Sequence, residues 1–391
     1  MSTIHAQTAP EAREGQPVTP LELFFDLVLV FAITQVTGFI SEDPNWTRLV
    51  EGLAILAALW WAWVSYAWLA NSAASDEGAA RVVSLAAMGA LLVTSLAVPH
   101  AFGADALVFG IAYFGVRMLH LGSYLVVAGS DAEMRRVVLR LTAHVVPAAL
   151  LLVAAGLVDG TARALCWALA LTIDYGGLAI RGVDGWKVEP GHFAERHGLI
   201  IIIALGESIV ALGVGAQGLG LDVTIVVAAL LGIATAGAMW WAYFDVVALV
   251  AERRFKALER VAQVRMARDS YTYLHLPMVA GIIVFAVGLK RTLAHVEEHL
   301  QTVEALTLCG GLALYLLALS AFKRRNVGSW NVRRLLAVAV LLGFWPVATR
   351  MPALAALGVV TALACGLIAW EALGMAEARD RVRHAGHDLT R

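Results

Sequence analysis

PLELFFDLVLVFAITQVTGFI, residues 20–40, is the stretch that decides the fold of this 391-residue chain. Its run from Leu21 to Ile40 is almost entirely apolar. At about 1.5 Å of rise per residue, a helix of this length matches the hydrocarbon core of a bilayer, about 30 Å thick. The stretch therefore predicts a membrane-spanning helix.

Two carboxylates lie near the start of this helix. Glu22 and Asp26 are four residues apart and therefore share one helix face. A charge at this depth costs a few kcal/mol unless it faces a partner, a cavity or the bundle interior. Two interpretations follow: an ion pair that fixes the helix to a neighbour, or a polar pathway through the membrane.

The composition extends this interpretation to the whole chain, because 60% of the residues are hydrophobic and only 15% are charged. Globular proteins contain about 25% charged residues. We therefore expect an all-α, polytopic transmembrane helix bundle of about 12 helices in contact with the lipid bilayer. The apolar runs are Leu21–Ile40, Leu49–Ala70, Val82–Pro99, Ala106–Ala128, Val137–Ala155, Ala162–Ile180, Gly198–Ala216, Val223–Val250, Tyr273–Leu289, Val303–Phe322, Leu335–Ala348 and Ala353–Trp370.

The distribution of basic residues predicts the orientation. Of the 29 Lys and Arg residues, 23 lie in the tails and in every second connection, five lie in the other connections, and Arg117 lies within a span. Cytoplasmic connections are the ones enriched in Lys and Arg, so we expect both termini in the cytoplasm.

A short repeat suggests how the chain is divided. Trp60-Trp61-Ala62-Trp63 recurs as Trp240-Trp241-Ala242-Tyr243. Six helices per half give the halves the same orientation, which predicts two six-helix parallel repeats. The expected parts are a cytoplasmic tail (1–20), a first half (21–181), a cytoplasmic linker (182–194), a second half (195–373) and a cytoplasmic tail (374–391).

Several classes of function find no support in the sequence. The cysteines Cys166, Cys309 and Cys365 lie in apolar runs without paired spacing, which predicts neither disulfides nor a metal site. No nucleophile or metal-hydrolase motif is present, so we expect neither enzymatic activity, catalytic residues nor a cofactor. The net charge of −1 gives no reason to expect nucleic acid as a partner. The sequence makes no prediction of the oligomeric state.

The seventh apolar run contains a lone carboxylate. Glu207 follows Gly198 by nine residues, which predicts a depth near the bilayer midplane. Gly206 and Ser208 flank it, and glycine-broken helices form midplane sites in several transporters. Either Glu207 and Ser208 bind a substrate or ion, or a neutral or Arg-paired Glu207 connects the two halves.

The fourth, sixth and eighth runs also contain ionisable side chains. Arg117 and His120 share one face of the fourth helix with two tyrosines, and Arg117 requires an acidic partner, for which Glu207, Asp26 and Asp174 are the alternatives. Asp174 can instead pair with Arg181. Asp245 lies in the eighth run at the position where the repeat has Ser65. We expect the acidic residues of the first, seventh and eighth helices to meet the Arg117 and His120 face.

Two motifs resemble those of a known family. ELFFDLVLVFAITQVT at Glu22–Thr37 and ERHGLIIIIALGESIVALG at Glu195–Gly213 are similar to the first and seventh helices of the bacterial low temperature requirement A (LtrA) family. The resemblance implies a multi-pass protein of the bacterial inner membrane, linked by name to growth in the cold, and implies no particular chemistry. The matching positions are Glu22, Phe24, Phe25, Asp26, Glu195, Arg196, Gly198, Gly206, Glu207 and Ser208.

Two functions are consistent with these observations. The first is a secondary transporter or ion pathway for a small solute, proton or cation. Its expected binding residues are Glu22, Asp26, Arg117, His120, Asp174, Glu207, Ser208 and Asp245. The second is a non-transporting scaffold or sensor in cold adaptation, whose buried charges only hold helices together.

Overall fold

The computed structural model describes residues 18–72, 78–129, 131–180, 185–218 and 220–374, and these residues form a helical bundle. The helices are α1 (Pro20–Glu42), α2 (Trp46–Ser72), α3 (Gly78–Leu96), η1 (Val98–His100), α4 (Ala106–Ala128), α5 (Ala132–Ala155), α6 (Gly160–Ile180), α7 (Pro190–Gly215), α8 (Val223–Phe244), α9 (Val247–Lys256), α10 (Arg260–Met266), the π-helix η2 (Ala267–Tyr273), α11 (His275–Ala294), α12 (Thr302–Val327), α13 (Val332–Ala348) and α14 (Ala353–Gly374).

Each of the twelve predicted apolar runs coincides with a helix, namely α1–α8 and α11–α14. Within the described residues, ten helical segments are long and apolar enough to cross a membrane, and α3 and α13 are shorter. Large apolar side chains such as Leu23, Phe24 and Leu27 on α1 are exposed, as expected of helices that face lipid. The prediction of an all-α, polytopic membrane protein is confirmed.

α1 begins where its sequence favours a helix start. Pro20 occupies the first turn, where its missing N–H is tolerated. Thr19 and Glu22 form a capping box: the Glu22 carboxylate accepts the Thr19 N–H at 2.8 Å, and the Thr19 hydroxyl accepts the Glu22 N–H at 3.3 Å. Glu22 is thus held at the helix start by local contacts of its own helix.

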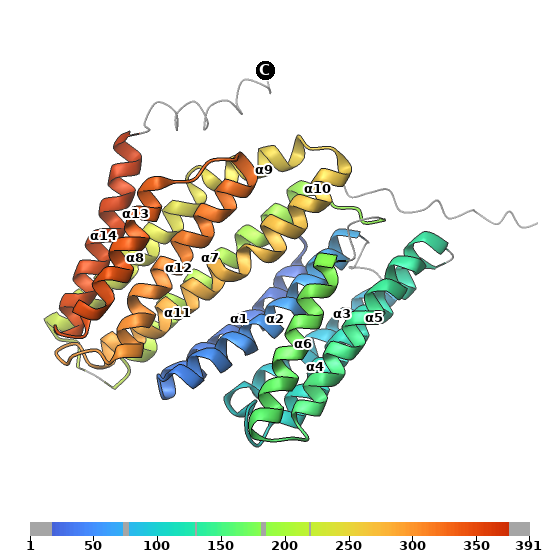
Figure 1. The fold of residues 1–391 in the computed structure, drawn as a ribbon, viewed down its shortest axis with the longest axis horizontal. Helices are drawn as coiled ribbons and strands as arrows, with labels where there is room; N and C mark the ends of the chain where they lie inside the picture. Colours follow the sequence, from blue (N-terminus) through green and yellow to red (C-terminus); the bar gives the residue numbers. More distant parts are fainter. Residues whose placement is uncertain (1–17, 73–77, 130, 181–184, 219, 375–391) are drawn as a thin grey trace, which may run out of the picture.

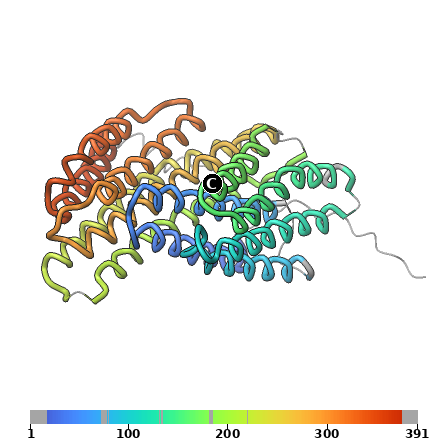
Figure 2. The backbone as a smooth tube through the Cα atoms, turned by 60° about the horizontal axis from the view of Figure 1, so that its bottom comes forward, coloured from blue at the N-terminus to red at the C-terminus, as the bar shows by residue number. Residues whose placement is uncertain are grey.

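α1 and α2 occupy the middle of the bundle (Figure 1). The helices α3–α6 lie on one side of them, and α8 and α12–α14 lie at the opposite end of the long axis (Figures 1 and 2). α1 packs against α2 and α3 on one side and against α7 and α11 on the other. The α1–α7 interface is therefore part of the boundary between the two predicted halves.

The structure differs from the predicted boundaries in two places. α7 begins at Pro190, eight residues before the predicted Gly198, because Glu189 caps it and its polar first turns have partners on α1 and α2. The long eighth run is divided at Asp245 into α8 and α9. α9, α10 and η2 then connect α8 to α11 at the upper edge of the bundle in Figure 1.

The two tryptophan motifs lie in different surroundings. Trp60 and Trp61 are only 1% and 4% exposed, whereas Trp240 and Trp241 are 45% and 40% exposed. A shared sequence motif therefore performs different packing roles in the two halves. The parallel repeat stays a prediction.

Candidate functional site

Four ionisable side chains meet where the first turns of α1 and α7 pack together, and we call this group the α1–α7 cluster. Arg196 Nη2 donates to Asp26 Oδ1 at 2.7 Å, and Arg196 Nη1 lies 3.9 Å from Glu22 Oε1. His192 Nε2 lies 3.1 Å from Glu22 Oε2. All four side chains are buried. A buried charge is tolerated when an opposite charge lies within hydrogen-bonding distance, as Arg196 does for Asp26.

α2 completes the surroundings of the α1–α7 cluster. Trp63 Nε1 donates to Asp26 Oδ1 at 2.7 Å, and the Arg196 guanidinium lies 5.5 Å from the Trp63 ring centre, within the range of a cation–π contact. Asn71 contacts His192 Nδ1 at 3.3 Å and bonds the Glu189 backbone. Three helices therefore hold these charges in a fixed geometry.

The α1–α7 cluster retains unused hydrogen-bonding capacity. Within the described part of the chain, Glu22 Oε1, Asp26 Oδ2 and Arg196 Nε have no hydrogen-bond partner. A cavity of about 20 Å³ borders Glu22 and Arg196. This volume suffices for one water-sized species, because a water requires about 10–15 Å³ by this measure. The cluster therefore combines polar atoms that lack a hydrogen-bond partner with space for one water-sized species.

A second polar group lies further along the same interface, and we call it the Glu207 group. Thr34 Oγ1 of α1 donates to Glu207 Oε2 at 2.7 Å. Lys290 of α11 interacts electrostatically with Glu207 and donates to Ser41 at 2.8 Å. Glu207 is buried and has a cation nearby.

An apolar layer separates the two groups. Asp26 and Thr34 are eight residues apart on α1, or about 12 Å along the helix axis. The buried apolar side chains in these stretches include Leu29 and Ile33 of α1 and Ile200 and Ala204 of α7. The interface thus alternates polar, apolar and polar.

Glu207 lies beyond the middle of α7, and its depth near the bilayer midplane stays a prediction. It follows Pro190 by 17 residues (190 to 207), about 25 Å along a helix whose full length is about 39 Å. The predicted depth near the midplane was measured from Gly198, but α7 begins eight residues earlier. Glu207 is therefore two-thirds of the way along α7. Ser208 is also buried, and its hydroxyl has no hydrogen-bond partner in the described ranges.

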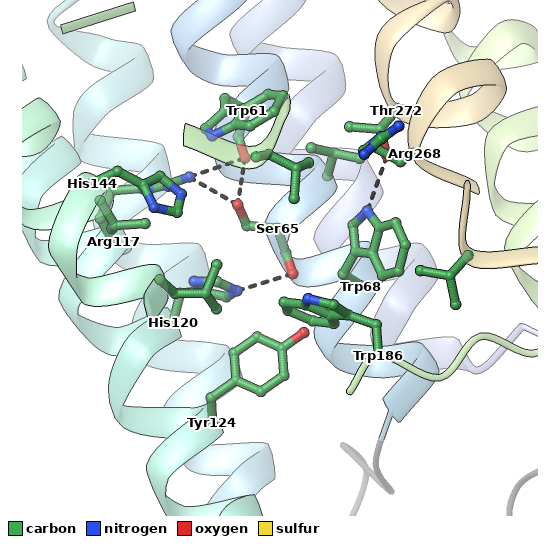
Figure 3. A pocket seen from close by; sticks show the side chains of 15 residues that line it. Trp61, Ser65, Trp68, Arg117, His120, Tyr124, His144, Trp186, Arg268 and Thr272 are labelled. Carbon is green, nitrogen blue, oxygen red and sulfur yellow. Dashed lines mark hydrogen bonds between the residues drawn. The ribbon is translucent and has the colours of Figure 1, made fainter. Parts of the chain in front are cut away.

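Arg117 pairs with Asp174, which is one of the three predicted partners. Arg117 Nη2 donates to Asp174 Oδ1 at 2.9 Å, and Tyr113 and Trp61 also bond this carboxylate. Arg117 Nη1 donates to Ser65 Oγ at 2.8 Å and to the Trp61 carbonyl at 3.1 Å (Figure 3). The alternative partner Arg181 lies outside the described residues. This pair joins α4 to α6 across α2.

An aromatic cavity of about 40 Å³ borders this pair, lined by Trp61, Trp68, Tyr124 and Trp186 among others. Figure 3 shows His120 directed towards α2, where its Nε2 contacts the Ser65 carbonyl at 3.1 Å. Among the described residues, His120 Nδ1 and Arg117 Nε have no hydrogen-bond partner.

The π-helix η2 forms another wall of the aromatic cavity through Arg268 and Thr272. Two indole N–H groups of α2 hold it: Trp60 donates to the Thr272 carbonyl and Trp68 to the Thr272 hydroxyl, both at 2.9 Å. The π-helical turn is thus stabilised by side chains from another helix. π-Helical turns recur at functional sites.

The predicted site residues do not form one cluster. Glu22 and Asp26 belong to the α1–α7 cluster, Glu207 to the second polar group, and Arg117 and His120 to the aromatic cavity. Asp245 lines a further cavity at the end of α8. The expectation that the acids of the first, seventh and eighth helices meet Arg117 and His120 was wrong, because Arg117 and Asp26 are each paired with a closer partner.

Sequence reasoning missed several members of these groups: His192, Arg196, Trp63, Thr34 and Lys290. His192 lay in a predicted connection, so its place in a helix was not visible. Arg196 precedes the predicted start of the seventh run, and its signal was that it belongs to the motif at residues 195–213. In the described ranges, no three His, Cys, Asp or Glu side chains are grouped to hold a metal ion.

Comparison with known proteins identifies relatives over most of the chain. The family model described as bacterial low temperature requirement A protein (LtrA) matches residues 17–369. An uncharacterized protein of Rhizobium meliloti (strain 1021) is 30% identical over 315 residues, which cover 78% of this chain and 76% of the relative. Both motif regions lie within the family match.

Proposed function

The chain belongs to the bacterial low temperature requirement A family, and from this premise we propose that it is a secondary transporter or ion pathway. In this proposal protons, or another small cation, move along the α1–α7 interface between the α1–α7 cluster and the Glu207 group. The observation that supports it most is the arrangement of two buried carboxylate groups on one interface with an apolar layer between them.

The chemistry of the two groups suits transient protonation. Intramembrane carboxylates are costly to bury and recur in proton relays and ion paths. Arg196 beside Asp26 and Lys290 near Glu207 supply the counter-charges that allow these carboxylates to lie within the bundle. The apolar layer formed by Leu29, Ile33, Ile200 and Ala204 acts as the barrier that a change in α1–α7 packing must open.

The proposal includes an orientation in the bacterial inner membrane. With both termini in the cytoplasm, as the distribution of Lys and Arg favours, the α1–α7 cluster faces the cytoplasmic side. Glu207 then lies in the outer part of the membrane, so the two groups would connect to opposite surfaces. The proposal assigns no enzymatic role and no cofactor.

Proton flux in liposomes tests this function. The purified protein is reconstituted around a pH-sensitive dye, and flux is recorded with and without an imposed potential for wild type, Glu207→Gln and Asp26→Asn. We expect protein-dependent flux in wild type and its loss in both variants, because each substitution keeps the shape of the side chain but removes its exchangeable charge. Monovalent cation gradients are tested in the same way.

Glu304→Gln is the matched control, because Glu304 is also a buried carboxylate paired with an arginine, but it lies on α12. The rival function, a scaffold or sensor, is favoured by the close pairing of Asp26 with Arg196 and of Asp174 with Arg117. Folded wild-type protein with no flux under any gradient contradicts the pathway. Variants that lose thermal stability but not flux support a structural role for these charges.

A further inference from the structure

A separate cavity of about 220 Å³ lies where α8, α12, α13 and α14 meet under α9, and we call it the α9 cavity. It belongs neither to the α1–α7 interface nor to the aromatic cavity. Its apolar walls include Trp241, Val250, Phe322 and Val327. Its polar residues come from the same end of the bundle, close to the last turn of α12 and the first turn of α13.

The charged floor of the α9 cavity is a matched pair. Arg334 Nε and Nη2 donate to the two oxygens of Glu371 at 2.9 Å each, and Asn331 donates to the same carboxylate at 2.7 Å. Arg334 Nη2 also donates to the Ala242 carbonyl at 3.1 Å. The carboxylate of Glu371 is thus fully engaged by protein donors.

Donors remain after this pairing. Arg334 and Asn326 are both at least nine-tenths buried. In the described part of the chain, Arg334 Nη1 and Asn326 Nδ2 have no hydrogen-bond partner. Lys323 also lines the cavity, and none of the ion pairs of the described residues includes it. Buried unpaired donors are costly, so such groups indicate a ligand that only accepts hydrogen bonds.

The carboxylate of Asp245 in the cavity wall limits the negative charge of a ligand bound there. Asp245 also lines the α9 cavity, and it is already engaged in an interaction within the protein. Its negative charge disfavours a dianion more than a monoanion, because the repulsion scales with the ligand charge. A phosphodiester, which has one negative charge and several acceptor oxygens, fits these donors better than a phosphate monoester.

The surroundings of the cavity indicate where such a phosphodiester would come from. Trp241 lines the cavity and is also 40% exposed, so the apolar wall continues onto the outer surface of α8. Exposed tryptophans concentrate at membrane interfaces, and basic pockets between membrane helices bind lipid headgroups. The exposed tryptophans and arginines around this end include Trp240, Trp241, Trp330, Trp370, Arg324 and Arg325.

We propose that the α9 cavity binds the phosphodiester headgroup of an anionic phospholipid. Arg334, Asn326 and Lys323 would donate to its oxygens, and its acyl chains would lie against the exposed outer surface beside Trp241. This site is independent of the proton pathway.

The test compares ligands and variants by thermal unfolding of the purified protein in a neutral detergent. The ligands are short-chain dihexanoylphosphatidylglycerol, inorganic phosphate and hexanoate. The variants are Lys323→Gln, which removes one partly exposed charge, and Asn326→Asp, which replaces the unpaired donor but keeps an acceptor for the Ser270 hydroxyl. Arg324→Gln is the matched control, because Arg324 is the exposed neighbour of Lys323 and does not line the cavity.

We expect saturable stabilisation by phosphatidylglycerol, with a half-saturating concentration about tenfold higher in Lys323→Gln and Asn326→Asp and unchanged in Arg324→Gln. Equal effects in all three variants would mean general charge attraction and overturn the site. Equal stabilisation by hexanoate overturns the phosphate assignment. Stabilisation by inorganic phosphate that matches the lipid and is lost in the same variants overturns the lipid source in favour of free phosphate.

Discussion

Within the residues that the structure describes, the buried ion pairs join different helices. Asp26 pairs with Arg196, Asp174 with Arg117 and Glu371 with Arg334, each at 2.7–2.9 Å. A buried pair contributes little net stability, but removing one member leaves an uncompensated charge that costs several kcal/mol. Such pairs therefore determine which helices can be neighbours.

Substitution of Arg196 tests the cost of breaking a buried ion pair in the α1–α7 cluster. We expect Arg196→Gln to lower the free energy of unfolding in mixed micelles by about 3–5 kcal/mol, because Asp26 and Glu22 lose their common cation. Adding Asp26→Asn to this variant should restore part of the loss, since the remaining buried charge is smaller.

Lys256→Gln is the control, because Lys256 forms an exposed pair with Glu252 on α9 and should cost about 0–1 kcal/mol. The pairing account is contradicted if the Arg196→Gln, Asp26→Asn double variant is destabilised by the sum of the two single changes.

The sequence predicted which charged residues share a helix face, but not which residues they pair with. The spacing of Glu22 and Asp26 placed both on one face, and both are buried on the same face of α1. For Arg117 three acids satisfied the spacing equally well, and only the packing of α4 against α2 and α6 selects Asp174. Partners more than 50 residues apart depend on tertiary packing, which helical periodicity does not encode.

At the scale of elements, α11 and α12 approach each other closely through glycines. A Cβ atom on Gly311 would lie 2.3 Å from the Phe285 backbone nitrogen, and one on Gly281 would lie 2.5 Å from the Tyr315 nitrogen. Small residues at such crossings let backbones pack tightly in membranes, where dispersion contacts replace the hydrophobic effect between helices.

Gly311→Ala should therefore separate α11 from α12 and lower the free energy of unfolding by about 1–3 kcal/mol, measured by denaturant titration in micelles. Gly343→Ala in α13 is the matched control, because a Cβ there meets no atom within 4 Å. That variant should be neutral or up to about 1 kcal/mol more stable, since alanine favours the helix. Equal effects at the two positions contradict a close crossing.

The apolar runs predicted the membrane-spanning helices, but hydropathy did not detect helical turns with polar side chains. The first two turns of α7 contain His192, Glu195 and Arg196, so hydropathy assigned them to a connection. α9 begins within the predicted eighth run, whereas α10 and η2 are short and basic, so hydropathy alone does not mark them as helices. Hydropathy detects contact with lipid, but not helices whose polar groups have partners inside the protein.

At the scale of the whole molecule, α1 and α2 lie between α3–α6 on one side and α8 with α12–α14 at the opposite end (Figure 1). An ion path along the α1–α7 interface is useful only if its two polar groups face opposite sides of the membrane. The proposed function therefore depends on the orientation of every connection, which can be measured directly.

Cysteine labelling in intact bacteria tests that orientation. In a background without Cys166, Cys309 and Cys365, single cysteines replace Asn45 between α1 and α2, Asp159 between α5 and α6, Glu259 between α9 and α10, or Ser329 between α12 and α13. We expect a membrane-impermeant maleimide to label the cysteines at 45 and 159 from outside, and those at 259 and 329 only after permeabilisation, because the basic connections remain in the cytoplasm. The inverse pattern would reverse the direction of the proposed path. Labelling of the cysteines at 45 and 259, or at 159 and 329, from the same side would contradict twelve crossings, because an odd number of crossings separates each of these pairs.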